Sequence, residues 1–248
     1  MGIRFEHVRK AFGPKEVLKD VEFDVGDGEC FFIIGASGVG KSVLIKHLIG
    51  LLKPDGGAIY LDGEDVSQLT EKQYYPVRMK CAMVFQNSTL FDSMTCVENV
   101  ALPLRKHKRL SMAKALEEAR RRLETVHMLE FAEAYPPALG DGMQKRVAIA
   151  RALTLDPRYV LFDEPTTALD PVSARRVDQM IRELCDEVGV TSIVVSHDLA
   201  SIFGIADRIA MLYKGHVRML GTPAEFRDTD DPVVQQFITG QADGPMEV

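Results

Sequence analysis

The sequence predicts an α/β protein with a mainly parallel β-sheet. Apolar runs of strand length, rich in β-branched and aromatic residues, recur at residues 58–61, 81–85, 159–162, 192–195 and 208–213. Stretches of helical spacing lie between several of these runs, at residues 42–52, 112–127 and 172–188. Strands that alternate with helices form βαβ units, and the parallel sheet of such units is covered by helices on both faces.

The first 25 residues follow a different pattern. Residues 3–12 and 17–25 alternate apolar and polar positions, which is typical of antiparallel strands with one solvated face. We therefore expect an N-terminal antiparallel β subdomain beside the parallel sheet.

Residues 87–140 predict a small α-helical subdomain inserted in the α/β core. They contain a highly charged helical stretch at 111–129, and Pro103, Pro136 and Pro137 mark expected breaks between elements. The predicted organisation is a core of residues 1–86 and 141–222, the helical subdomain at 87–140, and a C-terminal tail at 223–248. The tail contains one further helical stretch, at 232–238.

The composition of the 248 residues is that of an ordinary globular chain, with 46% hydrophobic and 27% charged residues. The net charge of −6 argues against broad electrostatic binding to nucleic acid or anionic lipid. The four cysteines are far apart and lack metal-ligand spacing, so we expect reduced thiols in a cytosolic protein. No signal peptide is visible, and no apolar run approaches the roughly 18 residues that span a bilayer. These features predict a soluble chain.

The stretch Gly-Ala-Ser-Gly-Val-Gly-Lys-Ser at 35–42 predicts a phosphate-binding loop, because it follows an apolar strand and precedes a helical pattern. Its glycines let successive backbone N–H groups face phosphate oxygens, and the helix start adds the positive end of its dipole. Lys41 carries a charge to the β- and γ-phosphates, and Ser42 offers a hydroxyl to Mg²⁺. The core is therefore expected to be a P-loop NTPase. The candidate nucleotide contacts are Gly35, Ala36, Ser37, Gly38, Val39, Gly40, Lys41 and Ser42.

Asp163 and Glu164 follow the apolar strand at 159–162 and form the second half of the predicted site. This position places both carboxylates at the carboxyl edge of the sheet, near the phosphate loop. Asp163 suits Mg²⁺ coordination through water, and Glu164 suits orienting and polarising an attacking water. The alternative is that Asp163 and Glu164 form an acidic turn with no catalytic or metal-binding role. The phosphate loop at 35–42 makes this alternative less favoured.

Six motifs together resemble the ATP-binding-cassette (ABC) ATPases. They are an aromatic residue at position 12, the phosphate loop, Val-Phe-Gln at 84–86, Leu-x-x-Gly-Met-x-x-Arg-Val-Ala-Ile-Ala-Arg-Ala-Leu at 139–153, Val-Leu-Phe-Asp-Glu-Pro-Thr-Thr-Ala-Leu-Asp at 160–170 and Val-Val-Ser-His-Asp at 194–198. Their order and spacing are similar to those of that family from about residue 3 to residue 222. The resemblance implies a chain that binds ATP and Mg²⁺ and hydrolyses ATP.

The resemblance also implies roles for four further residues. Phe12 resembles the aromatic residue that stacks on adenine, and Gln86 the glutamine that touches Mg²⁺ and the attacking water. His197 resembles the histidine that contacts the γ-phosphate, and its spacing from Glu164 disfavours a purely structural histidine. Asp170 resembles the residue that links the two composite sites of a head-to-tail dimer. In such a dimer each ATP lies between one chain's phosphate loop and the other chain's signature loop.

The signature loop departs from the family pattern Leu-Ser-Gly-Gly-Gln. Leu139 and Gly142 are kept, whereas Gly140 replaces the serine, Asp141 the first glycine and Met143 the glutamine. Gly140 lacks a hydroxyl donor to the γ-phosphate, and we expect the Asp141 carboxylate to cap its own helix and compete with phosphate. The alternatives are that Asp141 points outward, so that the loop acts through Gly142 and its backbone N–H groups, or that a dimer partner supplies a better signature loop. Gly140, Asp141 and Gly142 remain candidate ATP contacts.

Residues 87–105, Met143 and the ending at 237–245 resemble the ATPases of Mla/Mce-type bacterial lipid transporters. This resemblance implies a homodimer bound to integral membrane permease subunits, which are gripped by a groove formed between residues 86 and 139. It further implies a small regulatory subunit, a lipid-binding membrane-anchored protein and no nucleic-acid partner. The implied location is cytoplasmic, on the cytoplasmic face of the bacterial inner membrane.

Several other functions fit part of the pattern. An ABC ATPase for another cargo fits all the motifs. A non-transport ABC ATPase acting on nucleic acid or ribosomes is disfavoured, because the chain has neither a long coiled coil after Gln86 nor a second cassette. A P-loop kinase would not explain Asp170 or His197. A module that binds ATP without hydrolysing it would not explain Glu164 together with His197.

Overall fold

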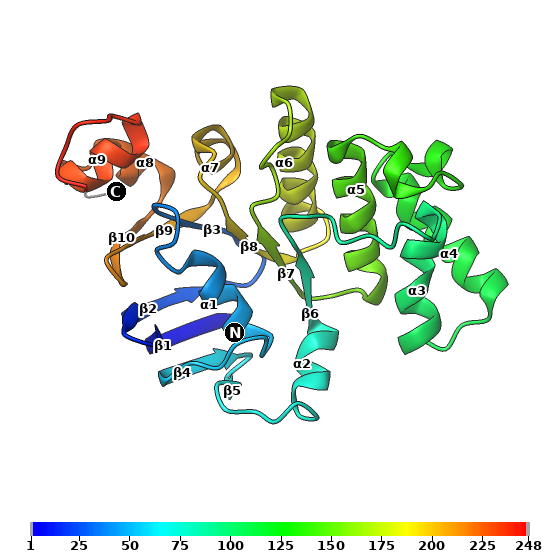
Figure 1. The fold of residues 1–248 in the computed structure, drawn as a ribbon, viewed down its shortest axis with the longest axis horizontal. Helices are drawn as coiled ribbons and strands as arrows, with labels where there is room; N and C mark the ends of the chain where they lie inside the picture. Colours follow the sequence, from blue (N-terminus) through cyan, green and yellow to red (C-terminus); the bar gives the residue numbers. More distant parts are fainter. Residues whose placement is uncertain (1, 247–248) are drawn as a thin grey trace.

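The strands of the computed structural model, which describes residues 2–246, join in one ten-stranded sheet (Figure 1). Their order across the sheet is β5-β4-β1-β2-β10-β9-β3-β8-β7-β6. Their bounds are β1 (Ile3–Phe12), β2 (Lys15–Val25), β3 (Cys30–Ile34), β4 (Gly56–Leu61), β5 (Glu64–Asp65), β6 (Cys81–Val84), β7 (Tyr159–Asp163), β8 (Thr191–Val195), β9 (Arg208–Tyr213) and β10 (His216–Gly221).

The sheet has a parallel part and an antiparallel part, as the sequence predicts. Strands β9, β3, β8, β7 and β6 run parallel to one another. Strand β1 pairs antiparallel with both β2 and β4, and β9 and β10 form an antiparallel hairpin. A short parallel pairing of β10 with β2 joins the two parts. The expected α/β fold with an N-terminal antiparallel section is therefore confirmed.

Most of the helices begin where the side chain of a capping residue satisfies their first N–H groups. Thr95 and Glu98 form a capping box at the start of α3, and the Asp170 carboxylate caps α6. Pro103 lies inside α3 rather than ending it, because the apolar face of that helix is buried on both sides of the proline. The bounds are α1 (Lys41–Leu48), α2 (Tyr74–Lys80), α3 (Cys96–His107), α4 (Met112–Thr125), α5 (Asp141–Ala152), α6 (Pro171–Asp186), α7 (Leu199–Ile205), α8 (Pro223–Asp228) and α9 (Pro232–Thr239).

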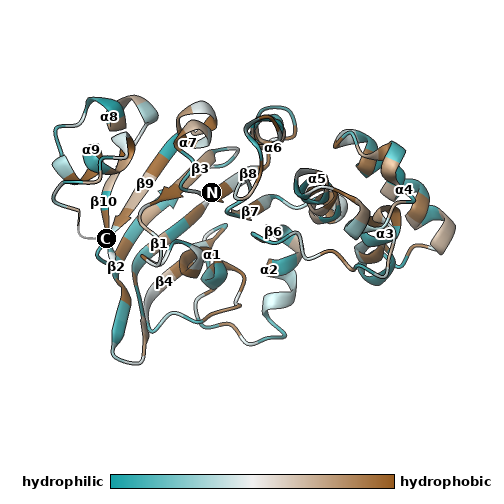
Figure 2. Cartoon of the chain, turned by 45° about the horizontal axis from the view of Figure 1, so that its top comes forward, coloured by the Kyte–Doolittle hydropathy of each residue, from teal (hydrophilic) through white to brown (hydrophobic). Residues whose placement is uncertain are grey.

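The central strand β3 faces two separate hydrophobic cores, which explains its unbroken apolar run. Phe31 and Ile33 pack with α1, α2 and the antiparallel strands, whereas Phe32 and Ile34 pack on the other side with the remaining helices. All four side chains are fully buried. Hydrophobic residues colour the central strands brown in Figure 2, whereas the outer surfaces of several helices are teal.

Helices α3 and α4 lie beside α5 and away from the antiparallel strands, at the right of Figure 1. Asp156 joins this group, because its carboxylate accepts from Lys108 Nζ and from Arg122 Nη2, each at 2.6 Å. At the other end of the chain, the region expected to hold one helix contains both α8 and α9. Helix α8 was missed because it is only six residues long, although Thr222 and Glu225 form a capping box at its start.

Candidate nucleotide-binding site

The phosphate loop connects the buried strand β3 to α1. Gly35, Gly38 and Gly40 have φ values of 136°, 75° and 109°, which other residues rarely adopt. A Cβ atom on Gly35 would lie 2.4 Å from the carbonyl oxygen of Leu212, so this glycine also permits close backbone approach. The glycines of the motif are therefore required by the loop's conformation as well as by a ligand.

Lys41 lies at the start of α1 and points into the loop. Its ammonium group donates to the carbonyl oxygens of Gly35, at 2.8 Å, and Ala36, at 3.0 Å. Only 7% of the residue is exposed. Burial lowers the pKa of Lys41, and the negative charges of Glu164 and Asp163 oppose that shift.

Ser42 and Asp163 are in direct contact, because the Ser42 hydroxyl donates to Asp163 Oδ1 at 2.5 Å. A hydroxyl and a carboxylate are the hard oxygen donors that Mg²⁺ prefers, so the pair fits a magnesium site. Residues 2–246 contain no group of three or more His, Cys, Asp or Glu side chains that could hold a metal ion. Mg²⁺ in nucleotide sites is typically held by one or two protein groups together with the phosphates.

Glu164 and His197 meet because the neighbouring parallel strands β7 and β8 end side by side, with Asp163 opposite Val195. The Nδ1 atom of His197 lies 2.8 Å from Glu164 Oε2. Thr167 Oγ1 also donates to that carboxylate, at 3.1 Å. Glu164 has a φ of 52°, an uncommon conformation for a non-glycine residue that is often found at functional sites.

These residues line one cavity of about 580 Å³. From the predicted site it includes Gly35, Ala36, Ser37, Gly38, Gly40, Lys41, Ser42, Gln86, Glu164 and His197. Val17, Val43 and Phe237 also line it and were not predicted. Val17 lies close in sequence to the predicted adenine contact, but Phe237 on α9 has no local sequence signal.

Besides the signature-loop residues and Asp170, three predicted contacts lie outside this lining. Phe12 is 46% exposed at the end of β1, and its ring centroid lies 5.5 Å from Lys10 Nζ. Val39 packs with the core behind the loop. Asp163 is buried, with 6% exposed, and reaches the cavity through Ser42.

The signature loop forms a second cavity, of about 400 Å³, which shares no residue with the first. Gly140, Asp141, Gly142 and Asp170 all line it. Helix α5 begins after Gly140, and no hydrogen bond to a described residue satisfies the Asp141 carboxylate. Asp141 therefore does not cap its own helix as expected, because it is the first helical residue rather than the N-cap.

Two further residues position the signature loop and were not predicted. The buried Lys145 of α5 donates to the carbonyl oxygens of Phe85, at 3.1 Å, and Gln86, at 2.5 Å. A Cβ atom on Gly142 would lie 3.0 Å from the Cβ atom of Ser173 on α6. Lys145 thus ties α5 to Gln86, and Gly142 lets the loop pack closely against Ser173 at the start of α6.

P-loop nucleotide-binding proteins share this placement of a glycine loop, its lysine and a carboxylate on the neighbouring strand. The geometry therefore assigns this chain to that class. The sequence comparison identifies the family within the class. The ABC transporter family model matches residues 18–167, so the chain belongs to the ABC transporter family and carries its ATP-binding domain.

Curated relatives cover nearly the whole chain. It is 35% identical to the probable ribonucleotide transport ATP-binding protein mkl of Mycobacterium leprae, over 99% of this chain and 72% of that protein. It is 36% identical to the intermembrane phospholipid transport system ATP-binding protein MlaF of Haemophilus influenzae, over 94% of this chain and 89% of that protein.

Solved structures agree with this assignment. The dimeric bacterial ABC transporter cassette MJ0796 has a TM-score of 0.82 and 33% identity, and the match covers 89% of this chain and 98% of that one. A dimer of the same cassette in a post-hydrolysis state, bound to ADP and phosphate, has a TM-score of 0.81. Within residues 2–246, the structure contains no helix with the length and apolar character needed to cross a membrane.

Proposed function

We propose that this chain is the ATP-hydrolysing subunit of a bacterial ABC transporter for phospholipid, of the Mla/Mce type. The observation that carries the hydrolysis step is the 2.8 Å contact between Glu164 and His197 in the same cavity as Lys41. A site that only bound ATP would need the phosphate loop, but not a carboxylate and an imidazole at its open end.

Each residue has a distinct part in the proposed reaction. Lys41 and the loop N–H groups bind the phosphates, and Lys41 exchanges two neutral carbonyl acceptors for charged ones. The Glu164 carboxylate accepts a proton from the attacking water, while His197 orients that carboxylate and faces the γ-phosphate. Ser42, Asp163 and Gln86 would hold Mg²⁺, which supplies charge stabilisation for the transferring phosphoryl group. The expected acid–base contribution of Glu164 is roughly 10²–10⁴-fold.

The proposed active unit is a head-to-tail homodimer. The signature loop and Asp170 lie in a cavity separate from the phosphate loop, so a second copy is needed to bring Gly140, Asp141 and Gly142 to the bound ATP. The dimeric MJ0796 cassettes support this arrangement. Phe12 would stack on the adenine base, from its exposed position at the end of β1.

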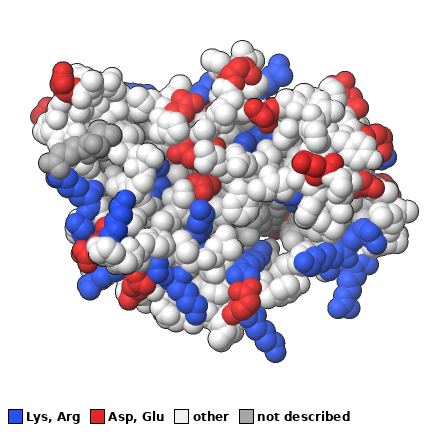
Figure 3. Space-filling model, viewed as in Figure 1, with Lys and Arg blue, Asp and Glu red and all other residues white. Residues whose placement is uncertain are grey.

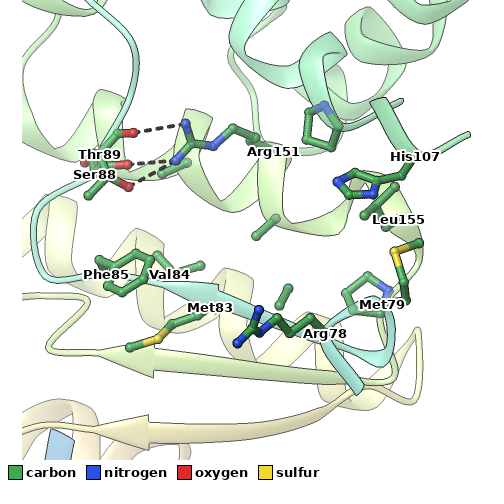
Figure 4. A pocket seen from close by; sticks show the side chains of 15 residues that line it. Arg78, Met79, Met83, Val84, Phe85, Ser88, Thr89, His107, Arg151 and Leu155 are labelled. Carbon is green, nitrogen blue, oxygen red and sulfur yellow. Dashed lines mark hydrogen bonds between the residues drawn. The ribbon is translucent and has the colours of Figure 1, made fainter. Parts of the chain in front are cut away.

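A groove of about 240 Å³ supports the proposed permease partner. It lies between the end of α2 with β6 and the facing helices α3 and α5, and it is lined by both apolar and cationic side chains. Arg151 is fixed at its edge by bonds to the carbonyl oxygens of Ser88 and Thr89 (Figure 4). The space-filling view shows a hollow right of centre, with Lys and Arg side chains below it (Figure 3).

The remaining proposals follow from the lipid-transport assignment. The permease subunits would hold the chain on the cytoplasmic face of the bacterial inner membrane, and a small regulatory subunit and a lipid-binding membrane-anchored protein would complete the transporter. The name of the mkl relatives indicates a second candidate cargo, ribonucleotides.

The hydrolysis proposal is tested with the purified chain, ATP and Mg²⁺. We expect Glu164→Gln to reduce turnover by about 100-fold or more while ATP binding persists, because the amide cannot accept the proton. Glu117→Gln on the exposed face of α4 is the matched control. Turnover at the wild-type rate in the Glu164→Gln protein would refute the role of this carboxylate.

The cargo proposal is tested by purifying the tagged chain with its membrane subunits and identifying bound small molecules by mass spectrometry. Phospholipid retained by the complex supports the assignment. Bound ribonucleotide other than the ATP and ADP of the phosphate loops, or a permease specific for amino acids or metals, contradicts it.

A further inference from the structure

Arg175 on α6 connects that helix to the loop that carries His197. Its Nη2 atom donates to Asp198 Oδ2 at 2.5 Å and to Ser201 Oγ at 3.1 Å. Its Nη1 atom lies 2.8 Å from Asp178 Oδ2. One guanidinium group is therefore held between two carboxylates, one on its own helix and one directly after His197.

Asp198 determines the path of the chain at His197. Its Oδ1 atom accepts from the backbone N–H groups of Ala200, at 3.0 Å, and Ser201, at 3.4 Å, so it is the N-cap of α7. Its own N–H group donates to Ser196 Oγ at 3.0 Å. His197 thus lies between two residues whose side chains define a turn.

Asp178 supplies the second carboxylate of the bridge. It is 3% exposed, and Arg175 is the cation paired with it in the described chain, although neither of its carboxylate oxygens has a hydrogen-bond partner there. A buried charged carboxylate needs such a cation nearby, so the ion pair draws the guanidinium group toward α6 as well as toward Asp198. The planar guanidinium also presents its donors in a fixed geometry, which a flexible ammonium group does not.

We propose that Arg175 is a positioning residue for ATP hydrolysis, which holds Asp198 and thereby keeps His197 against Glu164. Because His197 is 61% exposed on its side chain and its contact in the site is Glu164, the loop that precedes α7 must supply its orientation. The expected effect of Arg175 on the rate of ATP hydrolysis rests on the proposed ATPase activity. The expected displacement of His197 when Arg175 is replaced does not depend on that activity.

The competing explanation is that Arg175 only stabilises the packing of α6 against α7 and has no effect on His197. The following variants distinguish this structural role from the proposed positioning role. Removing Arg175 alone would leave Asp178 buried and unpaired, so the test protein is Arg175→Gln/Asp178→Asn. The matched control is Arg182→Gln, seven residues further along α6. Arg182 likewise lies between two carboxylates, Asp186 and Asp207, and joins α6 to the chain beyond α7. Both proteins are compared with wild type by thermal unfolding.

The first readout is the NMR spectrum of the histidine imidazole groups in the full chain. We expect the His197 nitrogen resonances to shift in Arg175→Gln/Asp178→Asn, because the 2.8 Å contact between Nδ1 and the Glu164 carboxylate is disturbed. They should stay in place in Arg182→Gln. The assignment of the His197 signal comes from its loss in His197→Gln.

The second readout is the division between kcat and KM. We expect kcat of the double variant to fall roughly 10- to 100-fold, since small misplacements of catalytic groups have effects of that size. KM should be unchanged because Arg175 does not line the nucleotide cavity, and Arg175→Lys should restore part of kcat. Either an unshifted His197 signal or a wild-type kcat in the double variant overturns the proposal. If wild type hydrolyses no ATP, the proposed function fails, and the NMR comparison still decides whether Arg175 holds the loop.

Discussion

Inside the phosphate loop, the ammonium group of Lys41 donates to two carbonyl groups of the same loop. This arrangement satisfies a buried charge that would otherwise destabilise the fold. The carbonyl oxygens are neutral acceptors, so a phosphate offers Lys41 stronger, charge-assisted bonds in the same place. Lys41 thus stabilises the conformation of the loop and also favours the binding of a negatively charged ligand there.

At the signature loop, we predict that the double substitution Gly140→Ser/Asp141→Gly raises ATP turnover. The serine adds a hydroxyl donor to the facing γ-phosphate, and the second change removes a carboxylate that carries no hydrogen bond within the described chain. A gain of about 1.4 kcal/mol in transition-state binding corresponds to a roughly tenfold increase in rate. Steady-state ATPase assays measure it, with Gly140→Ala as the control that adds no donor. Unchanged turnover would mean that these two positions do not limit the site.

At the scale of elements, α9 carries a C-terminal side chain into the nucleotide cavity. Asp231 caps this helix and pairs with Arg218 Nε on β10 at 2.8 Å. The side chain of Gln236 accepts from the backbone N–H of Met246 at 2.6 Å, so the chain folds back over the helix. Helix α9 is therefore held from both ends, and Phe237 projects beside the phosphate loop.

We predict that Phe237→Ala raises the KM for ATP by roughly three- to tenfold, because part of an aromatic contact surface is lost. The value of kcat should not change, since the phenyl ring of Phe237 has no group that can take part in the proposed proton transfer. Ile238→Ala is the control, because Ile238 lies on the same helix and, like Phe237, packs against the core, but it does not line the nucleotide cavity. Equal KM values for the two variants would show that Phe237 does not contact the nucleotide.

The contacts of Asp156 with α3 and α4 make the helical region sensitive to acid. Burial alone would raise the pKa of Asp156, but the bonds from Lys108 and Arg122 hold that pKa below its usual value of 3.8. A carboxyl group with a lowered pKa stabilises the fold fully above its ordinary pKa, and that contribution is lost as the pH falls below it.

Asp156→Asn should accordingly lower the melting temperature at pH 7 by about 2 °C, which corresponds to up to about 1 kcal/mol for a largely exposed ion pair. Asparagine suits the test because it tolerates the φ of 52° at this position. The difference between the two proteins should shrink as the pH drops below 3.8. Calorimetry across that range measures it, and a difference independent of pH would contradict the assignment to charge.

For the whole molecule, the phosphate loop and the signature loop occupy separate cavities of one chain. A ligand can shift such a molecule between monomer and dimer only if it binds the two arrangements with different affinity. In the proposed dimer, ATP between the two chains would do this, because its phosphates would contact both. Hydrolysis would then remove one of the bridging groups and favour opening.

We therefore predict that Glu164→Gln forms a stable dimer in the presence of ATP and Mg²⁺. Its mass by light scattering should be about twice the 27.6 kDa of one chain. With ADP the same protein should be monomeric, because the γ-phosphate is missing. A Glu164→Gln/Lys41→Ala protein is the control for nucleotide binding. A variant that binds ATP but remains monomeric would contradict the composite site.

The α/β fold and the phosphate loop were predictable because both depend on neighbouring residues. The apolar runs specify the strands. The phosphate loop is a contiguous motif whose glycines adopt positive φ values that other residues rarely adopt. The contact of Glu164 with His197 was predictable only as a spacing, since it requires β7 and β8 to be adjacent. The capping role expected for Asp141 was wrong, because the helix begins at that residue rather than after it.

The sequence by itself determined that this chain folds as an ABC ATP-binding domain, because periodicity and short motifs define those elements locally. Only the tertiary structure decided which distant residues share a surface. It brought Phe237 to the phosphate loop, Lys145 to Gln86 and Arg175 to Asp198. These long-range contacts depend on the order of the strands and on the packing of the helices across the sheet. Strand order and helix packing are determined by long-range burial of apolar surface rather than by any single stretch of sequence.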